Sequence, residues 1–144
     1  MTASVQFSVS ADTYPVQASA PGSPLSVQPG DYRAAVAAGA IPVDIRSHRK
    51  RSVDGALFGA LAIDPTEVID LLTPGDVKAL RLATTDARWI LVSDDGHEAE
   101  WFAWHLQARG VIGAVFVVGG FRRLRSAGIN GQINRGELEV FSAH

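Results

Sequence analysis

Short apolar runs alternate with stretches of helical periodicity along most of the chain. Residues 41–46, 89–92 and 111–118 are nearly all apolar and end in polar residues or glycine, a pattern typical of buried parallel strands. Residues 25–27 predict a further short strand, and residues 55–63 predict a glycine-bracketed bend followed by another. Strands that alternate with helices indicate an α/β domain with a mainly parallel central sheet flanked by helices on both faces.

Helix start and stop residues mark the segments between these strands. Asp64 suits an N-cap, Pro65 suits a first helical turn, and Gly39 and Gly110 suit helix ends. The charged residues 47–52 predict an exposed basic turn. The expected helices cover residues 29–38, 64–72, 76–82 and 98–109, and a last short helix follows Gly119-Gly120 and ends at Ala127-Gly128.

Length and periodicity predict one domain with an extension at each end. The 144 residues, 47% of them hydrophobic, suffice for one ordinary core and not for two. Residues 1–23 lack a sustained period and predict a flexible or loosely docked arm, although residues 5–9 alternate like an edge strand. Residues 24–129 form the expected domain. Residues 130–144 form a C-terminal extension, in which residues 137–141 suit an edge strand.

Composition excludes several kinds of chemistry and partner. A net charge of −2 provides no basic footprint, so neither nucleic acid nor an anionic membrane surface is an expected partner. The chain contains no cysteine, which excludes disulfides, thiolate metal sites, persulfides and a cysteine nucleophile within it. No apolar run approaches the eighteen or more residues of a spanning helix. We expect a cytoplasmic protein without a cofactor, and the oligomeric state stays open.

The stretch from Trp89 to Leu106 contains the candidate functional site. It reads as a strand, a polar loop at residues 93–98 and a helix. Ligands of α/β domains bind outside the carboxyl ends of the strands, where helix N-termini and free loop amides converge. The loop Ser93-Asp94-Asp95-Gly96-His97-Glu98 is therefore the expected site.

Three separated segments together resemble the rhodanese-like domain family. Residues 43–46 with 55–60 resemble its Asp-x-Arg strand end and its Gly-His-Ile-Pro-Gly-Ala bend. Residues 90–106 resemble its strand, active-site loop and helix, and residues 110–129 resemble its Gly-Gly-Phe and Ala-Gly ending. The similarity covers roughly residues 24 to 129. It implies the α/β fold described above and, for active members, sulfur transfer by a loop cysteine.

The departures from the family pattern fall on the loop. Ser93 stands where the family has its cysteine, Glu98 where it has Arg or Thr, and Ala99 where it has Ser. A serine oxygen cannot carry a transferable sulfane sulfur. Asp94 and Asp95 add two more negative charges, and a like-charge contact at ~4 Å costs about 4 kcal/mol at an effective dielectric of ~20. We therefore expect no sulfurtransferase activity and poor binding of anions.

Two altered activities at this loop are weaker alternatives. Ser93 could be a nucleophile with His97 as its base, but no third residue is identifiable to orient the imidazole. Asp94, Asp95, His97 and Glu98 could bind a divalent cation. Carboxylates at this position are explained more simply as caps of the following helix.

The helix expected over residues 98–109 carries two aromatic faces. Trp101, Trp104 and His105 share one face, whereas Phe102 and Leu106 share another. A helix that packs on a sheet buries one face as core. The other is a candidate partner surface, because exposed tryptophan is a common interface anchor.

Asp44 and Arg46 end the strand over residues 41–46. A strand-end ion pair is the favoured interpretation, and a pair facing a substrate is the alternative. The basic residues 46–51 suit a solvated turn, but they could also complement the acidic loop and close a neutral pocket.

These observations favour a non-catalytic binding or regulatory module. A protein partner would contact the acidic loop or the Trp101 and Trp104 face of the helix. The alternative is an altered enzyme, either a Ser93-dependent hydrolase or a metal-dependent one. A cysteine replaced by serine for study ranks last, because Glu98 and Ala99 would still depart from the family.

Overall fold

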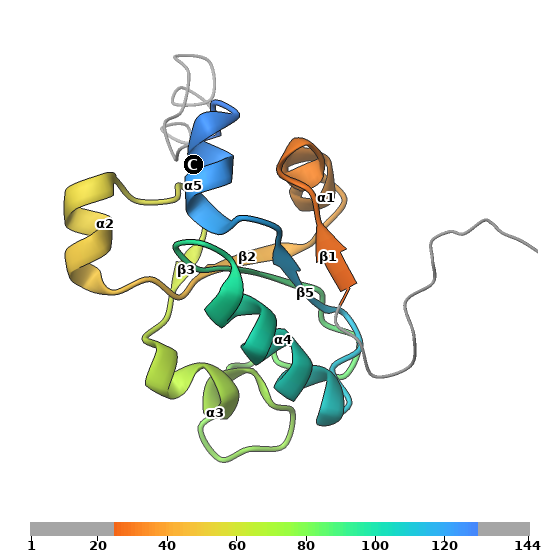
Figure 1. Cartoon of the computed structure of the whole chain (residues 1–144). Helices are drawn as coiled ribbons and strands as arrows, with labels where there is room; N and C mark the ends of the chain where they lie inside the picture. The colour runs from red at the N-terminus through yellow and green to blue at the C-terminus, as the bar shows by residue number, and fades with distance from the viewer. Residues whose placement is uncertain (1–24, 130–144) are drawn as a thin grey trace, which may run out of the picture.

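A computed structural model describes residues 25–129, and these form a five-stranded sheet with helices on both faces (Figure 1). All four strand pairings are parallel, in the order β1-β5-β4-β2-β3. The strands are β1 (Leu25–Val27), β2 (Ile41–Asp44), β3 (Leu61–Ala62), β4 (Trp89–Val92) and β5 (Ala114–Val117). The α/β class and the parallel sheet predicted from the sequence are confirmed.

Helical segments connect the strands. The chain contains the 3₁₀ turns η1 (Pro29–Asp31) and η2 (Pro65–Glu67) and the helices α1 (Tyr32–Ala37), α2 (His48–Asp54), α3 (Val68–Leu72), α4 (His97–Ala108) and α5 (Gly120–Ser126). The Asp64 side chain accepts the Thr66 amide, so it is the predicted N-cap, here of η2. Gly110 follows α4 with φ of 92°, the left-handed conformation expected after a helix end.

Side chains alternate between the two faces of the central strand β4. All four of its residues are buried. Trp89 and Leu91 belong to the core beneath α3 and α4, together with Phe102 of α4. Ile90 and Val92 belong to a second core. The sheet therefore separates two apolar layers, as its near-continuous hydrophobic strands predict.

The second core lies beneath α1 and α5. It contains Tyr32 from the start of α1 and Phe121 and Leu124 from α5. In Figure 1, α1 and α5 lie on the side of the sheet away from α3 and α4. The start of α5 is thereby fixed next to the carboxyl end of β4.

The turn predicted at residues 47–52 is wrong, because residues 48–52 lie in α2, although most of the segment is exposed as predicted. Ser47 is the N-cap of α2 and accepts the Lys50 amide at 3.1 Å. No residue of α2 is buried. The segment therefore lacks the apolar periodicity by which a helix is recognised in a sequence.

The helix predicted over residues 76–82 is also wrong. The structure has turns there, and the Leu80 amide donates to the Leu71 carbonyl at 2.8 Å instead of to a helical neighbour. Val77 is fully exposed. Tertiary pairing of the backbone has overridden the local helical preference.

The strand predicted over residues 111–118 is shorter than expected and begins only at Ala114. A Cβ on Gly113 would lie 2.5 Å from the Ala87 carbonyl oxygen, so a close backbone approach precedes the strand. The predictions for residues 1–23 and 130–144 lie outside the described residues. Within residues 25–129, no helix combines the length and hydrophobicity that a membrane span requires.

The buried face of α4 should dominate the stability of the domain. Leu106 is fully buried, so Leu106→Ala should lower the free energy of unfolding by about 2–5 kcal/mol through lost transfer energy and a cavity. Ile112, 73% exposed, is the matched control, and Ile112→Ala should change it by about 0.5 kcal/mol or less. Urea denaturation checks both. Equal losses would contradict the assignment of the core face.

Candidate functional site

Ser93 lies at the end of β4 and turns its hydroxyl toward the loop that follows. The residue is 2% exposed. Its Oγ accepts the Gly96 amide at 3.0 Å and the Ala99 amide at 3.2 Å. Ala99 lies in the first turn of α4, so its amide belongs to the group that helices leave unpaired at their N-terminus. The serine thus fills, from within the chain, a cradle of amides that suits a negative charge.

The start of α5 packs directly on this loop. The Phe121 amide donates to the Ser93 carbonyl at 2.8 Å, and the Arg122 amide donates to the Asp94 carbonyl at 3.1 Å. A Cβ on Gly120 would lie 2.3 Å from the Ser93 carbonyl oxygen and 2.6 Å from the Gly96 nitrogen. Only glycine permits this approach, and Gly120 also has a φ of 62°. The resemblance to the rhodanese-like family included the Gly-Gly-Phe segment at residues 119–121. The sequence did not show that this segment packs against the loop at residues 93–98.

The loop carboxylates are compensated to different degrees. The Asp94 carboxylate lies 2.7 Å from Nη2 of Arg122 and 3.7 Å from Nζ of Lys50. Lys50 therefore connects the basic segment to the acidic loop. This agrees with the alternative interpretation of residues 46–51, in which their charges complement those of the loop. Asp95 accepts the His97 amide at 3.0 Å, and this bond holds the pKa of its carboxyl below the usual range. The Glu98 side chain is exposed.

The arrangement does not favour either altered enzyme. The two partners of the Ser93 hydroxyl within residues 25–129 are backbone amides, whereas the His97 side chain is 86% exposed and faces Asp95 at 3.3 Å. Ser93 and His97 are therefore not paired as nucleophile and base. Nor do three or more acidic or histidine side chains gather as a metal site within the described part of the chain. Asp94 faces cations, so the loop residues do not converge on one point.

Asp44 and Arg46 form a buried ion pair at the carboxyl end of β2, as the favoured interpretation predicts. Arg46 Nε and Nη2 donate to the two Asp44 oxygens at 3.0 and 2.7 Å. The guanidinium also donates to the Gly55 carbonyl at 2.8 Å and lies 3.6 Å from the centre of the Phe121 ring. The ion pair therefore connects β2 to the start of α5.

Burial, reinforced by the Asp44 charge, raises the pKa of the Tyr32 phenol far above its usual range.

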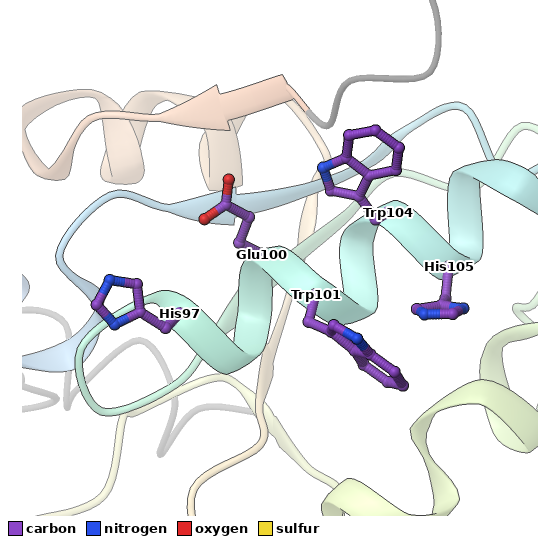
Figure 2. Close-up of a pocket in the computed structure, with 5 residues that line it drawn as sticks. All are labelled: His97, Glu100, Trp101, Trp104 and His105. Carbon is purple, nitrogen blue, oxygen red and sulfur yellow. The ribbon is translucent and has the colours of Figure 1, made fainter.

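The outer face of α4 carries the exposed aromatic residues. Trp101 and Trp104 are 55% and 47% exposed, while Phe102 and Leu106 are buried, so the predicted division of the helix is confirmed. A shallow hollow of about 420 Å³ is lined by His97, Glu100, Trp101, Trp104 and His105 (Figure 2). The Trp101 and His105 rings lie side by side with centroids 3.9 Å apart.

Solved structures of known proteins share this architecture. A rhodanese-related protein from Thermoplasma volcanium matches 72% of this chain over 93% of its own, with 16% identity and a TM-score of 0.55. The chain has a rhodanese-like fold.

Two further structures agree with this assignment of the fold. A protein of unknown function from Rhodopseudomonas palustris, described as a possible tyrosine phosphatase, matches 73% of this chain over 82% of its own. Its identity is 22% and its TM-score 0.66. The reduced CoADR-RHD protein of Bacillus anthracis matches 70% of this chain over 16% of its own, at 20% identity and a TM-score of 0.55. No protein-family model matches the chain, and no curated protein matches it significantly.

The close packing of the loop at residues 93–98 against the start of α5 can be tested at Gly120. Gly120→Ala places a methyl group against the Ser93 and Gly96 backbone, so it should lower the free energy of unfolding by at least about 1–3 kcal/mol. Gly128 has a φ of 81° with nothing near its Cβ position, so Gly128→Ala reports the backbone strain alone. Urea denaturation of both variants should show the larger loss at Gly120. An equal loss would mean that close packing adds nothing to backbone strain.

The buried ion pair gives a second stability test. Arg46→Ala leaves the Asp44 carboxylate buried without its cation and should cost about 3–5 kcal/mol. Lys50→Ala removes ion pairs from a half-exposed side chain and should cost about 1 kcal/mol or less. Thermal and urea unfolding measure both. A cost at Arg46 no larger than that at Lys50 would contradict a structural role for the pair.

Proposed function

We propose that this rhodanese-like domain is a non-catalytic binding or regulatory module without sulfurtransferase activity. The observation that carries this proposal is the buried Ser93 hydroxyl, which accepts both the Gly96 and the Ala99 amide. The position where the family would carry its reacting sulfur is thus occupied by a side chain that is bonded within its own loop. A group held in this way is suited to fixing the loop conformation.

The chemistry of sulfur transfer supports the same conclusion. Transfer needs a thiolate that accepts a sulfane sulfur and passes it on, and the chain contains no cysteine. A serine alcohol has a far higher pKa than a thiol and forms no persulfide. No neighbouring residue of the chain can supply the missing thiol.

Phosphate chemistry at the loop meets an independent obstacle. An oxyanion at the N-terminus of α4 would be held by free amides, and Ser93 already occupies those of Gly96 and Ala99. The description of the Rhodopseudomonas palustris protein as a possible phosphatase concerns that protein. In this chain, the amides engaged by Ser93 argue against an equivalent reaction.

Charged groups at the rim of the loop provide a surface for a partner. Asp94, Lys50 and Arg122 form a partly exposed network of both signs, next to Asp95. Such a surface gives specificity and orientation more than affinity, because solvent screens each pair. Recognition through this rim, with no bond made or broken, is the function that we propose for the site.

Thiosulfate-to-cyanide sulfur transfer tests the loss of catalysis. The natural chain and the Ser93→Cys variant should both show no turnover above the uncatalysed rate, because position 93 is 2% exposed and carboxylates lie beside it. Turnover by the natural chain would overturn the proposal. Turnover by Ser93→Cys would show that the loop remains competent and that only the thiol is missing.

Thiol labelling separates burial from loss of folding in the same variant. The cysteine of Ser93→Cys would be the only thiol in the chain, so a maleimide reagent reports its accessibility directly. It should react slowly in the native protein and rapidly in denaturant. Ser52, which is exposed on α2, gives the matched control, and Ser52→Cys should react rapidly in both. Fast native labelling at position 93 would contradict the closed cradle.

A further inference from the structure

The aromatic hollow on α4 shares only His97 with the loop at residues 93–98, and the function proposed above does not use it. Its two indoles are about half exposed, and Glu100 is the one acidic residue among those that line it. Exposed tryptophans that line a common hollow are typical of a surface that binds another polypeptide segment. The question is which chain covers it.

The topology brings the start of β1 to the side of α4 that carries Trp104. Helix α4 runs from the carboxyl edge of the sheet to the amino edge, so Trp104 lies nearer the amino edge than His97 does. Strand β1 is parallel to β5, with Leu25 opposite Val115, and therefore starts at that same amino edge. Figure 2 shows the Trp104 ring on the flank of α4 that faces β1. The described chain thus begins, at Leu25, on the side of α4 that carries Trp104.

The sequence of that entering segment suits an aromatic surface. Among residues 1–24, the one charged side chain is Asp12, so docking this segment would remove almost none of the segment's own charge from water. Three of the seven prolines of the chain fall here, at positions 15, 21 and 24. Proline-rich segments in extended conformation bind grooves lined by aromatic rings, because little conformational freedom is lost on binding.

We propose that residues 14–24 of the same chain dock on the α4 hollow lined by Trp101 and Trp104. Pro21-Gly22 is a sequence typical of the central residues of a type II turn, which would reverse the chain before β1. Residues 14–20 then lie along α4, with residue 20 near Trp104 and with Tyr14 and Pro15 near His97. An extended proline-rich segment covers ~3.1 Å per residue. Seven residues therefore span roughly the ~18 Å length of the twelve-residue α4.

Covalent attachment favours this occupant over a second copy of the chain. A tethered segment that starts beside the groove has an effective concentration in the millimolar range, so weak contacts suffice to dock it. A second copy would have to overcome the full loss of translational freedom. The proposal is independent of the function assigned to the Ser93 loop, since sulfur transfer and docking of the arm are measured separately.

Paramagnetic labelling of the full-length chain tests the docking. Thr13→Cys places the sole cysteine next to the docked segment, where it carries a nitroxide spin label. The chain has three tryptophans, and their indole N–H signals are resolved probes of distance from the label. The signals of Trp101 and Trp104 should lose most of their intensity. The signal of Trp89, which is buried in the core, is the internal control and should be affected far less.

Mixed samples and matched variants decide between the possible results. Nitroxide-labelled chain without ¹⁵N, mixed with ¹⁵N chain without nitroxide, should show no loss; loss in the mixture would assign the hollow to a second copy and overturn the proposal. Equal loss at all three tryptophans, or none at Trp101 and Trp104, would overturn it as well. In the natural background, Trp101→Ala with Trp104→Ala should shift the amide signals of residues 14–24. Val53→Ala, at an exposed apolar site on α2, should leave them unchanged.

Discussion

The structure around the loop depends on one close approach between two backbone segments. Gly120 lies so near the Ser93 and Gly96 backbone that even a methyl group would collide with it. Hydrogen bonds from the Phe121 and Arg122 amides then hold the loop to the first turn of α5. These contacts fix the direction in which the chain leaves β4 and enters α4. They also seal the inner side of Ser93, so the loop is closed by backbone packing.

Two further interactions extend from this contact to neighbouring elements. The Arg46 guanidinium lies over the Phe121 ring and is itself paired with Asp44 at the end of β2. On the outer side, Arg122 and Lys50 neutralise Asp94, and Lys50 belongs to α2, a helix with no buried residue. The inner pair is desolvated and structural, whereas the outer pairs are exposed and weak. Helix α2 is thus tied to the loop by charge, with no apolar core of its own.

The Ser93 hydroxyl explains how the loop keeps its shape without a reacting group. Amides that converge at a helix N-terminus are costly to leave unpaired in a buried place, and a bound anion or a thiolate would satisfy them. Here a neutral oxygen of the chain satisfies the amides of Gly96 and Ala99. The geometry of the loop therefore does not depend on a bound anion or a thiolate. In the function that we propose, the charged rim carries recognition.

The sequence by itself determined the fold class, the central strands, the Asp64 cap, the two faces of α4 and the position of the loop between β4 and α4, since each follows from local periodicity or turn chemistry. It also showed that a thiol is absent. Tertiary structure alone decided that residues 76–82 do not form a helix, because Leu80 bonds to Leu71 nine residues earlier. It decided that Asp94 is neutralised, because Lys50 and Arg122 come from distant segments. Helix α2 was not predicted because it has no apolar face. The packing of Gly120 against the loop was not predicted either, because a close approach between two backbone segments leaves no periodic pattern in the sequence of either one.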